Sequence, residues 1–117
     1  MHTYTPGLHI LSSFNAAGTA LQDAGACKAF FDSIIEESGL SKVGEVYHQF
    51  DNGGFTAVIC LTESHVSIHT WPEFGLATFD VFLSNFKNDN TEKARVFHHR
   101  TLDFFGAAEI NTQEVVR

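Results

Sequence analysis

Hydrophobic and polar residues alternate along several stretches of the chain. The alternation runs through residues 8–14, 42–50, 55–64 and 76–84. A period of two is typical of strands that present one face to a core. A turn signal at residues 51–54, Asp-Asn-Gly-Gly, predicts a hairpin between the second and third of these strands.

Two other segments have the three-to-four spacing of amphipathic helices. The first follows Asp23, a candidate N-cap, and ends at Gly39. Its apolar face consists of Cys27, Phe30, Phe31, Ile34 and Ile35. The second spans residues 91–106, and its His98 and His99 are expected to face solvent.

The order of these elements predicts the fold class. It is strand, helix, three or four strands, helix, and a last edge strand at residues 108–116, which indicates an α+β fold. We expect a two-layer sandwich: an antiparallel sheet with two helices on one face. The other face carries Val46, Phe50 and Val58 and looks apolar, so a second copy of the chain is its simplest cover. This favours a homodimer in which two sheets form a larger sandwich.

Composition narrows the classes of partner. A chain of 117 residues with 44% hydrophobic residues is expected to form one domain, 1–117. The net charge of -7 and the lack of a basic run argue against nucleic acid. No signal-peptide pattern or long apolar stretch is present, which predicts a cytoplasmic protein that does not bind membranes. Cys27 and Cys60 are too few for a disulfide scaffold, and we expect two buried free thiols.

Residues 62–73 gather the reactive side chains of the sequence. They follow an apolar run and read Thr-Glu-Ser-His-Val-Ser-Ile-His-Thr-Trp-Pro-Glu. A buried strand is a rigid support for such groups. His65 and His69 have a spacing that binds metals on helices, but Pro72 and the strand pattern exclude that geometry. We therefore expect no metal site here.

At these residues the chain resembles the prokaryotic S-adenosylmethionine decarboxylase proenzymes. The resemblance also covers Gly7-Leu8-His9-Ile10-Leu11, residues 46–50, residues 54–57 and Asp80-Val81-Phe82, about three quarters of the chain. It implies a lyase that converts S-adenosylmethionine into the aminopropyl donor for spermidine and other polyamines. It also implies sandwiched α/β protomers that dimerise and share active sites between chains.

The resemblance further implies a zymogen that cuts itself between Glu63 and Ser64, into fragments 1–63 and 64–117. The Ser64 hydroxyl attacks the preceding carbonyl, and elimination of the ester leaves a pyruvoyl group that forms a Schiff base with the substrate. No external cofactor is then needed. His69 matches the histidine that removes the serine α-proton, and Thr56 matches an assisting hydroxyl. Continuous alternation places Ser64 on the face of Thr56 and Cys60 but opposite His69, so a bulge or movement after cleavage is expected to unite them.

Three further residues match the substrate contacts of that family. Phe50 and Trp71 match the aromatic rings that hold the adenine, and Glu73 matches the carboxylate that accepts the ribose hydroxyls. Stacking of a base on an aromatic ring is worth about 1–3 kcal/mol in nucleic-acid binders. A sulfonium is also attracted to aromatic faces.

One position departs from the family pattern. Ser84 stands where the family has the cysteine that protonates the carbanion after decarboxylation. A hydroxyl is a much weaker acid than a thiol. Two alternatives therefore stay open: a pyruvoyl-dependent decarboxylase of another amino acid, such as ornithine or arginine, and a catalytically weak regulatory homologue. Cys60 is a less favoured replacement donor.

Overall fold

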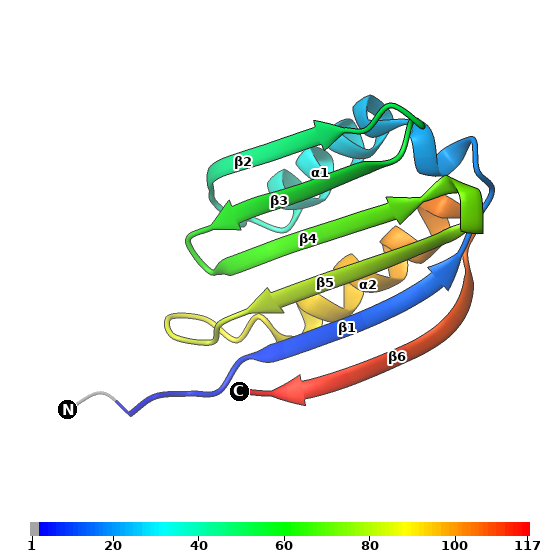
Figure 1. Cartoon of the computed structure of the whole chain (residues 1–117). Coiled ribbons are helices and arrows are strands. Elements are labelled where there is room, and N and C mark those ends of the chain that lie inside the picture. The colour runs from blue at the N-terminus through cyan, green and yellow to red at the C-terminus, as the bar shows by residue number, and fades with distance from the viewer. Residues whose placement is uncertain (1–2) are drawn as a thin grey trace.

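The computed structural model describes residues 3–117, which form one antiparallel sheet with two α-helices on the same face (Figure 1). This arrangement confirms the predicted α+β fold. The elements are β1 Leu8–Asn15, η1 Ala20–Gln22, α1 Ala24–Glu37, β2 Lys42–Gln49, β3 Phe55–Leu61, β4 Ser64–Trp71, η2 Pro72–Phe74, β5 Leu76–Leu83, α2 Thr91–Phe105 and β6 Ala108–Val116.

The strands do not lie side by side in chain order. Their order across the sheet is β2-β3-β4-β5-β1-β6, so β1 lies between β5 and the C-terminal strand β6. The strands β2 to β5 form a meander of antiparallel neighbours. The predicted edge strand at 108–116 is confirmed, because β6 pairs only with β1 in the described sheet.

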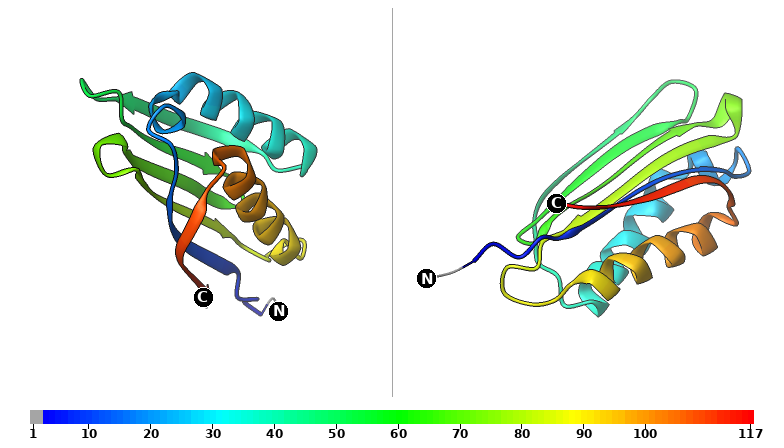
Figure 2. Two further views of the ribbon diagram at one scale, coloured as in Figure 1. Left: turned by 90° about the vertical axis from the view of Figure 1, so that its right-hand side faces the viewer. Right: turned by 90° about the horizontal axis from the view of Figure 1, so that it is seen from below.

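The core fills the space between the sheet and the two helices, which cover one face in both views of Figure 2. Alternate residues of β3, β4 and β5 point into this layer, as Ile59, Ile68 and Phe79 illustrate by their complete or nearly complete burial. Phe31 of α1 and Phe97 of α2 meet there with ring centroids 5.5 Å apart. The hydrophobic effect on this face therefore sets the position of both helices.

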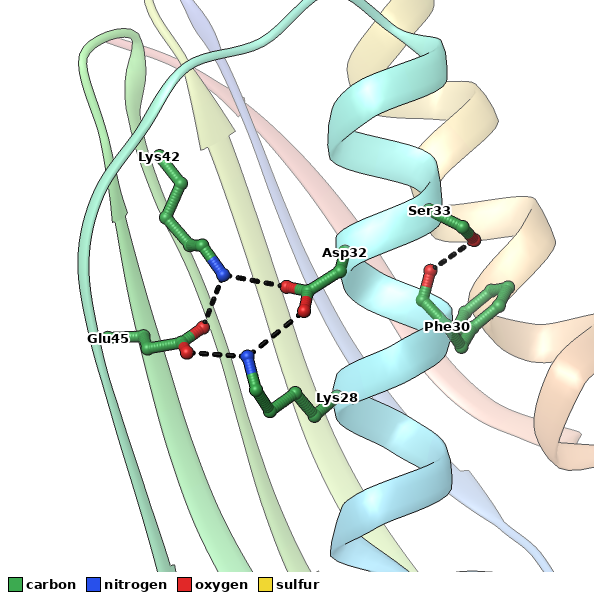
Figure 3. A network of polar contacts seen from close by, with 6 residues as sticks. All are labelled: Lys28, Phe30, Asp32, Ser33, Lys42 and Glu45. Carbon is green, nitrogen blue, oxygen red and sulfur yellow. Dashed lines mark hydrogen bonds and ion pairs between the residues drawn. The ribbon is translucent and has the colours of Figure 1, made fainter.

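Helix α1 is capped and tied to the edge strand β2. The Asp23 carboxylate accepts a hydrogen bond from the backbone N–H of Ala26 at 2.9 Å, which confirms the predicted N-cap. Four side chains then link the helix to the strand in a closed ring of ion pairs, 2.6–3.0 Å long (Figure 3). They are Lys28, Asp32, Lys42 and Glu45.

The predicted strand over residues 55–64 is wrong at its end. The chain turns at Thr62 and Glu63, and Ser64 begins the next strand, β4. Buried positions are odd-numbered up to Leu61 and even-numbered from Val66 onward. A tight hairpin turn causes this change from odd to even positions. Ser64 therefore pairs across the hairpin with Leu61 and does not continue the face of Thr56 and Cys60.

Three other expectations are corrected. Cys27 is buried, but Cys60 is exposed on the sheet face away from the helices, and both thiols are free. His98 is buried beneath the β1–β6 edge, where its Nε2 lies 3.1 Å from Ser12 Oγ, whereas His99 faces solvent. The outer face of the sheet is mixed rather than apolar, because polar groups such as Ser67 and Asp80 lie on it together with exposed Val46, Phe50 and Val58.

No helix within residues 3–117 has the length and apolarity needed to span a membrane.

Candidate functional site

The first group of predicted site residues lines a pocket of about 440 Å³ where β2 and β3 are joined and β4 ends. The lining residues are Phe50, Asp51, Asn52, Thr56, His69, Thr70 and Trp71. Four of these seven were predicted from the sequence, two as substrate contacts and two as processing residues. The fold brings them together because β3 and β4 pair in a hairpin with Thr56 directly opposite His69.

A hydroxyl and an imidazole form the polar centre of this pocket. Thr56 Oγ1 lies 3.0 Å from His69 Nδ1, and the ring of His69 lies 6.2 Å from that of Trp71. Both Thr56 and His69 are partly buried. The pair provides a hydrogen-bonded base beside an aromatic surface, an arrangement suited to holding a flat ligand and moving a proton near it.

Buried hydrogen bonds hold the wall of the pocket in place. The Thr70 hydroxyl accepts from the backbone N–H of Phe55 at 2.9 Å and donates to the carbonyl of Leu21 at 2.7 Å. Gly54 packs so tightly here that an added Cβ would lie 2.9 Å from the Thr70 carbonyl oxygen. A larger residue at Gly54 would therefore push the β2–β3 turn away from the pocket.

Glu73 lies beside this pocket rather than in its lining. It belongs to η2 and lines an adjoining open hollow of about 550 Å³. Its carboxylate accepts a hydrogen bond of 2.5 Å from the side-chain amide of Asn52, and Asn52 lines both spaces. Glu73 is therefore positioned at the edge of the aromatic pocket by a residue of the facing turn.

The second group lies around the Glu63–Ser64 peptide bond. Ser64 has a φ of 152°, and it is the only non-glycine residue among 3–117 with a positive φ. Such a conformation is sparsely populated by residues with a side chain, and it stores on the order of 1–3 kcal/mol of strain. The carbonyl oxygen of Glu63 accepts a hydrogen bond of 2.7 Å from the backbone N–H of Ser84. The Ser64 hydroxyl lies 3.3 Å from His65 Nδ1.

Ser84 is held against this junction by the loop that leads to α2. Buried Asn90 donates from its side-chain amide to the Ser84 carbonyl oxygen at 2.9 Å. A small pocket of about 170 Å³ opens beside it. Its lining residues are Thr62, Glu63, Ser84, Phe86, Lys87, Asn88 and Asn90. The structure therefore brings together Glu63, Ser64 and Ser84, which are separated by up to 21 positions in the sequence.

The two groups lie at opposite ends of the sheet. Figure 1 shows the β3–β4 and β5–α2 connections at one end, whereas β2 and β4 finish at the other. Pairing of β4 with both neighbours runs from Ser64 to His69 without a bulge, so about 17 Å of extended strand separates the two residues. The expected bulge is therefore wrong, and His69 does not reach Ser64 in the uncut chain, whereas movement after cleavage stays a prediction.

Some residues at these sites were not predicted as functional. Asn52 was interpreted only as part of a turn and Thr70 only as a member of the motif, and Asn90 was not singled out. Their positions depend on pairing between distant segments, and only the Asp-Asn-Gly-Gly turn signal pointed to one of them. No group of three or more His, Cys, Asp or Glu side chains within residues 3–117 has the geometry of a metal site.

Comparison with known proteins identifies the family to which this chain belongs. A family model described as S-adenosylmethionine decarboxylase matches residues 8–117. The chain is similar to the S-adenosylmethionine decarboxylase proenzyme of Archaeoglobus fulgidus, at 46% identity over 55 residues, which cover 47% of this chain and 49% of that one. It is also similar to the proenzyme of a Sulfurihydrogenibium species, at 39% identity over 99 residues, which cover 84% of this chain and 74% of that one. The chain thus spans about half the length of the first relative and about three quarters of the second.

A solved structure gives the same result for the fold. The crystal structure of the adenosylmethionine decarboxylase from Aquifex aeolicus superposes with a TM-score of 0.79 at 28% sequence identity. The superposition covers 98% of this chain and 91% of that chain. Because the family model matches residues 8–117 of the 117, this chain belongs to the S-adenosylmethionine decarboxylase family.

Proposed function

We propose that this protein is a self-processing decarboxylase of S-adenosylmethionine that makes its own pyruvoyl group from Ser64. The observation that carries the proposal is the geometry at the Glu63–Ser64 bond: a strained serine follows a carbonyl that is already hydrogen-bonded. Family membership and the aromatic pocket support the choice of substrate.

The first step is an attack of the Ser64 hydroxyl on the carbonyl carbon of Glu63. Negative charge then develops on the Glu63 oxygen, where the backbone N–H of Ser84 lies 2.7 Å away and can stabilise it. Breaking the peptide bond turns the amide into an ester and also relieves the strain at Ser64. Elimination from this ester separates 1–63 from 64–117 and requires a base for the α-proton of Ser64.

The residue assigned to that second proton is His69, and we place it in another chain. Because His69 and Ser64 occupy opposite ends of β4, one chain does not hold a complete site. A two-fold pairing of the outer sheet faces, with strands running in opposite directions, would place the Thr56–His69 end of one copy over the Ser64–Ser84 end of the other. Exposed Val58 and Trp71 supply apolar area on that face.

The substrate would then bind between the two ends. When present, the pyruvoyl group supplies a carbonyl that withdraws electrons from the substrate carbon as carbon dioxide leaves. Phe50 and Trp71 offer their rings to the adenine and attract the sulfonium, while Glu73 accepts hydrogen bonds from the ribose. Ser84 lies at the end that holds the reacting carbon, where it is the candidate proton donor.

Chain cleavage is the direct test. Wild-type protein is expected to give two fragments, 1–63 and 64–117, with the second blocked at its N-terminus because the Ser64 amine has been lost. Ser64→Ala should remain a single chain and release no carbon dioxide from S-adenosylmethionine. Intact mass spectrometry and denaturing gels distinguish these results, with Ser67→Ala on the same strand as the matched control. A wild-type chain that stays whole after prolonged incubation would refute the proposal.

A further inference from the structure

The imidazole that contacts the Ser64 hydroxyl belongs to the next residue in the chain. His65 Nδ1 lies 3.3 Å from Ser64 Oγ, whereas His69 lies at the far end of β4. The contact is possible because Ser64 has a positive φ, so the normal alternation of the strand is broken at this residue. In a regular strand, neighbouring side chains would point to opposite faces.

Aromatic neighbours on two other strands hold the ring of His65. It meets His9 of β1 edge-on, with centroids 5.9 Å apart, and Phe82 of β5 in the same way at 6.1 Å. His65 is itself partly buried. These contacts restrict the rotation of the ring and keep Nδ1 beside the hydroxyl.

His9 forms a neutral neighbour for this imidazole. The Arg117 guanidinium donates to His9 Nδ1 at 3.3 Å, so the proton of neutral His9 is on Nε2. Burial lowers the pKa of His9, an effect that exceeds the opposing attraction of Asp80. The other titratable or charged groups near this cluster are Asp80 and Arg117, which act on His9, and Cys60, which lies opposite His65 on β3. Of the two imidazoles in this cluster, His65 is the one that contacts the Ser64 hydroxyl, and it is also partly open to solvent.

We propose that His65 is the general base for the first step of self-processing and that it acts within its own chain. The inference rests on the proposed function. His65 Nδ1 takes the proton of Ser64 Oγ as the oxygen forms a bond to the Glu63 carbonyl carbon. The C–N bond then breaks and the same proton passes to the nitrogen, leaving an ester and a free amine. The step is an isomerisation in which nothing is oxidised or reduced.

This assignment divides the two proton transfers between two histidines. His65 removes the hydroxyl proton of Ser64 in its own chain, and His69 of a second copy removes the α-proton of Ser64. An imidazole is suited to the first role, because it accepts a proton and returns it at neutral pH. General bases of this kind typically contribute about 10²- to 10⁴-fold to a rate.

The test measures processing rather than decarboxylation. Chains labelled with leucine are made by cell-free synthesis, and the loss of the full-length band is followed over time at pH 5.5–8.5. His65→Asn keeps a hydrogen-bonding group near the Nδ1 position but cannot accept the proton. We expect it to slow cleavage by about 100-fold or more and to change the pH profile of the cleavage rate. His99→Asn, at an exposed histidine of α2, is the control and should cleave like the wild type.

Ester trapping separates the first step from the second. In a His69→Ala background the chain should stop at the ester, which hydroxylamine cleaves into two fragments. Adding His65→Asn to that background should prevent this sensitivity, because the ester no longer forms. Free imidazole should restore cleavage to His65→Gly, a result that loss of structure would not give.

The outcomes distinguish the two proposals. If wild-type chains stay whole, the proposed function fails and this inference fails with it. If wild-type chains cleave and His65→Asn cleaves at the same rate with the same pH profile, only the role of His65 is overturned. Hydroxylamine sensitivity that survives in the His65→Asn, His69→Ala double variant would overturn it as well.

Discussion

Ser84 contributes two different groups to the junction, and they have different consequences. Its backbone N–H contacts the Glu63 carbonyl oxygen at 2.7 Å, and any residue other than proline provides that donor. Its side chain stands in the position of the cysteine in the resembled family. Processing should therefore tolerate a change of this side chain, whereas turnover should respond to its acidity.

Replacing Ser84 with cysteine tests that separation. We expect Ser84→Cys to raise the rate of carbon dioxide release from S-adenosylmethionine at least about tenfold, which corresponds to about 1.4 kcal/mol of barrier, because a thiol is the better acid. The rate of chain cleavage should stay close to that of the wild type. Ser84→Ala is the matched control and should lower turnover while leaving cleavage intact. An unchanged rate in Ser84→Cys would mean that the proton comes from another group.

At the scale of elements, the ring of ion pairs joins α1 to the edge strand β2. Hydrogen bonds from Lys28 and then from Lys42 lower the pKa of Glu45. Glu45 therefore stabilises the folded chain at pH values above the ordinary carboxyl range, and this contribution disappears as the pH falls through the lowered pKa. Because the four side chains are only partly buried, each ion pair contributes modestly.

Removing the Glu45 charge should loosen the contact between α1 and β2. We expect Glu45→Gln to reduce the free energy of unfolding by about 0.5–1 kcal/mol at pH 7 in low salt. The difference from wild type should shrink in high salt and disappear as the pH falls through the lowered pKa of Glu45. Urea unfolding at several pH values measures it. Glu36→Gln, at an exposed position of the same helix outside the ring, is the control, and an equal effect there would contradict the argument.

At the scale of the whole molecule, the separation of the two residue groups leads us to propose a pair of chains. Thr56 and His69 lie at one end of the sheet, and Ser64 and Ser84 lie at the other. A single chain should therefore stall after the ester step, and a homodimer should contain two equivalent sites. Light scattering is expected to find a dimer at micromolar concentration.

Mixing two inactive variants tests the shared site. Ser64→Ala lacks the nucleophile, and His69→Ala lacks the second base, so neither should form the blocked 64–117 fragment alone. When both are produced in one cell, random pairing gives mixed dimers with one intact site, and about half of the His69→Ala chains should mature. Mass spectrometry detects the fragment. Pairing His69→Ala with the Ser64→Ala, His69→Ala double variant should give none, and maturation of His69→Ala by itself would exclude the arrangement.

Much of this molecule was determined locally by its sequence. The amphipathic period of α1, its cap at Asp23 and the turn at residues 51–54 act over a few positions, so the elements could be predicted from short segments. Phe50, Thr56, His69 and Trp71 were identified through the family resemblance, whereas their grouping comes from the β3–β4 hairpin, which the sequence analysis did not predict. The buried residues change from odd-numbered to even-numbered positions at the hairpin turn of Thr62 and Glu63. The prediction missed this change and continued the strand through the turn.

Only the tertiary structure decided how the chemistry is distributed. The contact between Ser84 N–H and the Glu63 carbonyl depends on the register of β4 against β5, which is set by the burial of whole strand faces. The contact of His65 with Ser64 depends on a backbone angle that sequence pattern does not specify. The distance between Ser64 and His69 depends on β4 being straight and continuously paired. The reactive residues could be identified from the sequence because they lie in short motifs. Which residues they contact depends on pairing between segments that are distant in the chain.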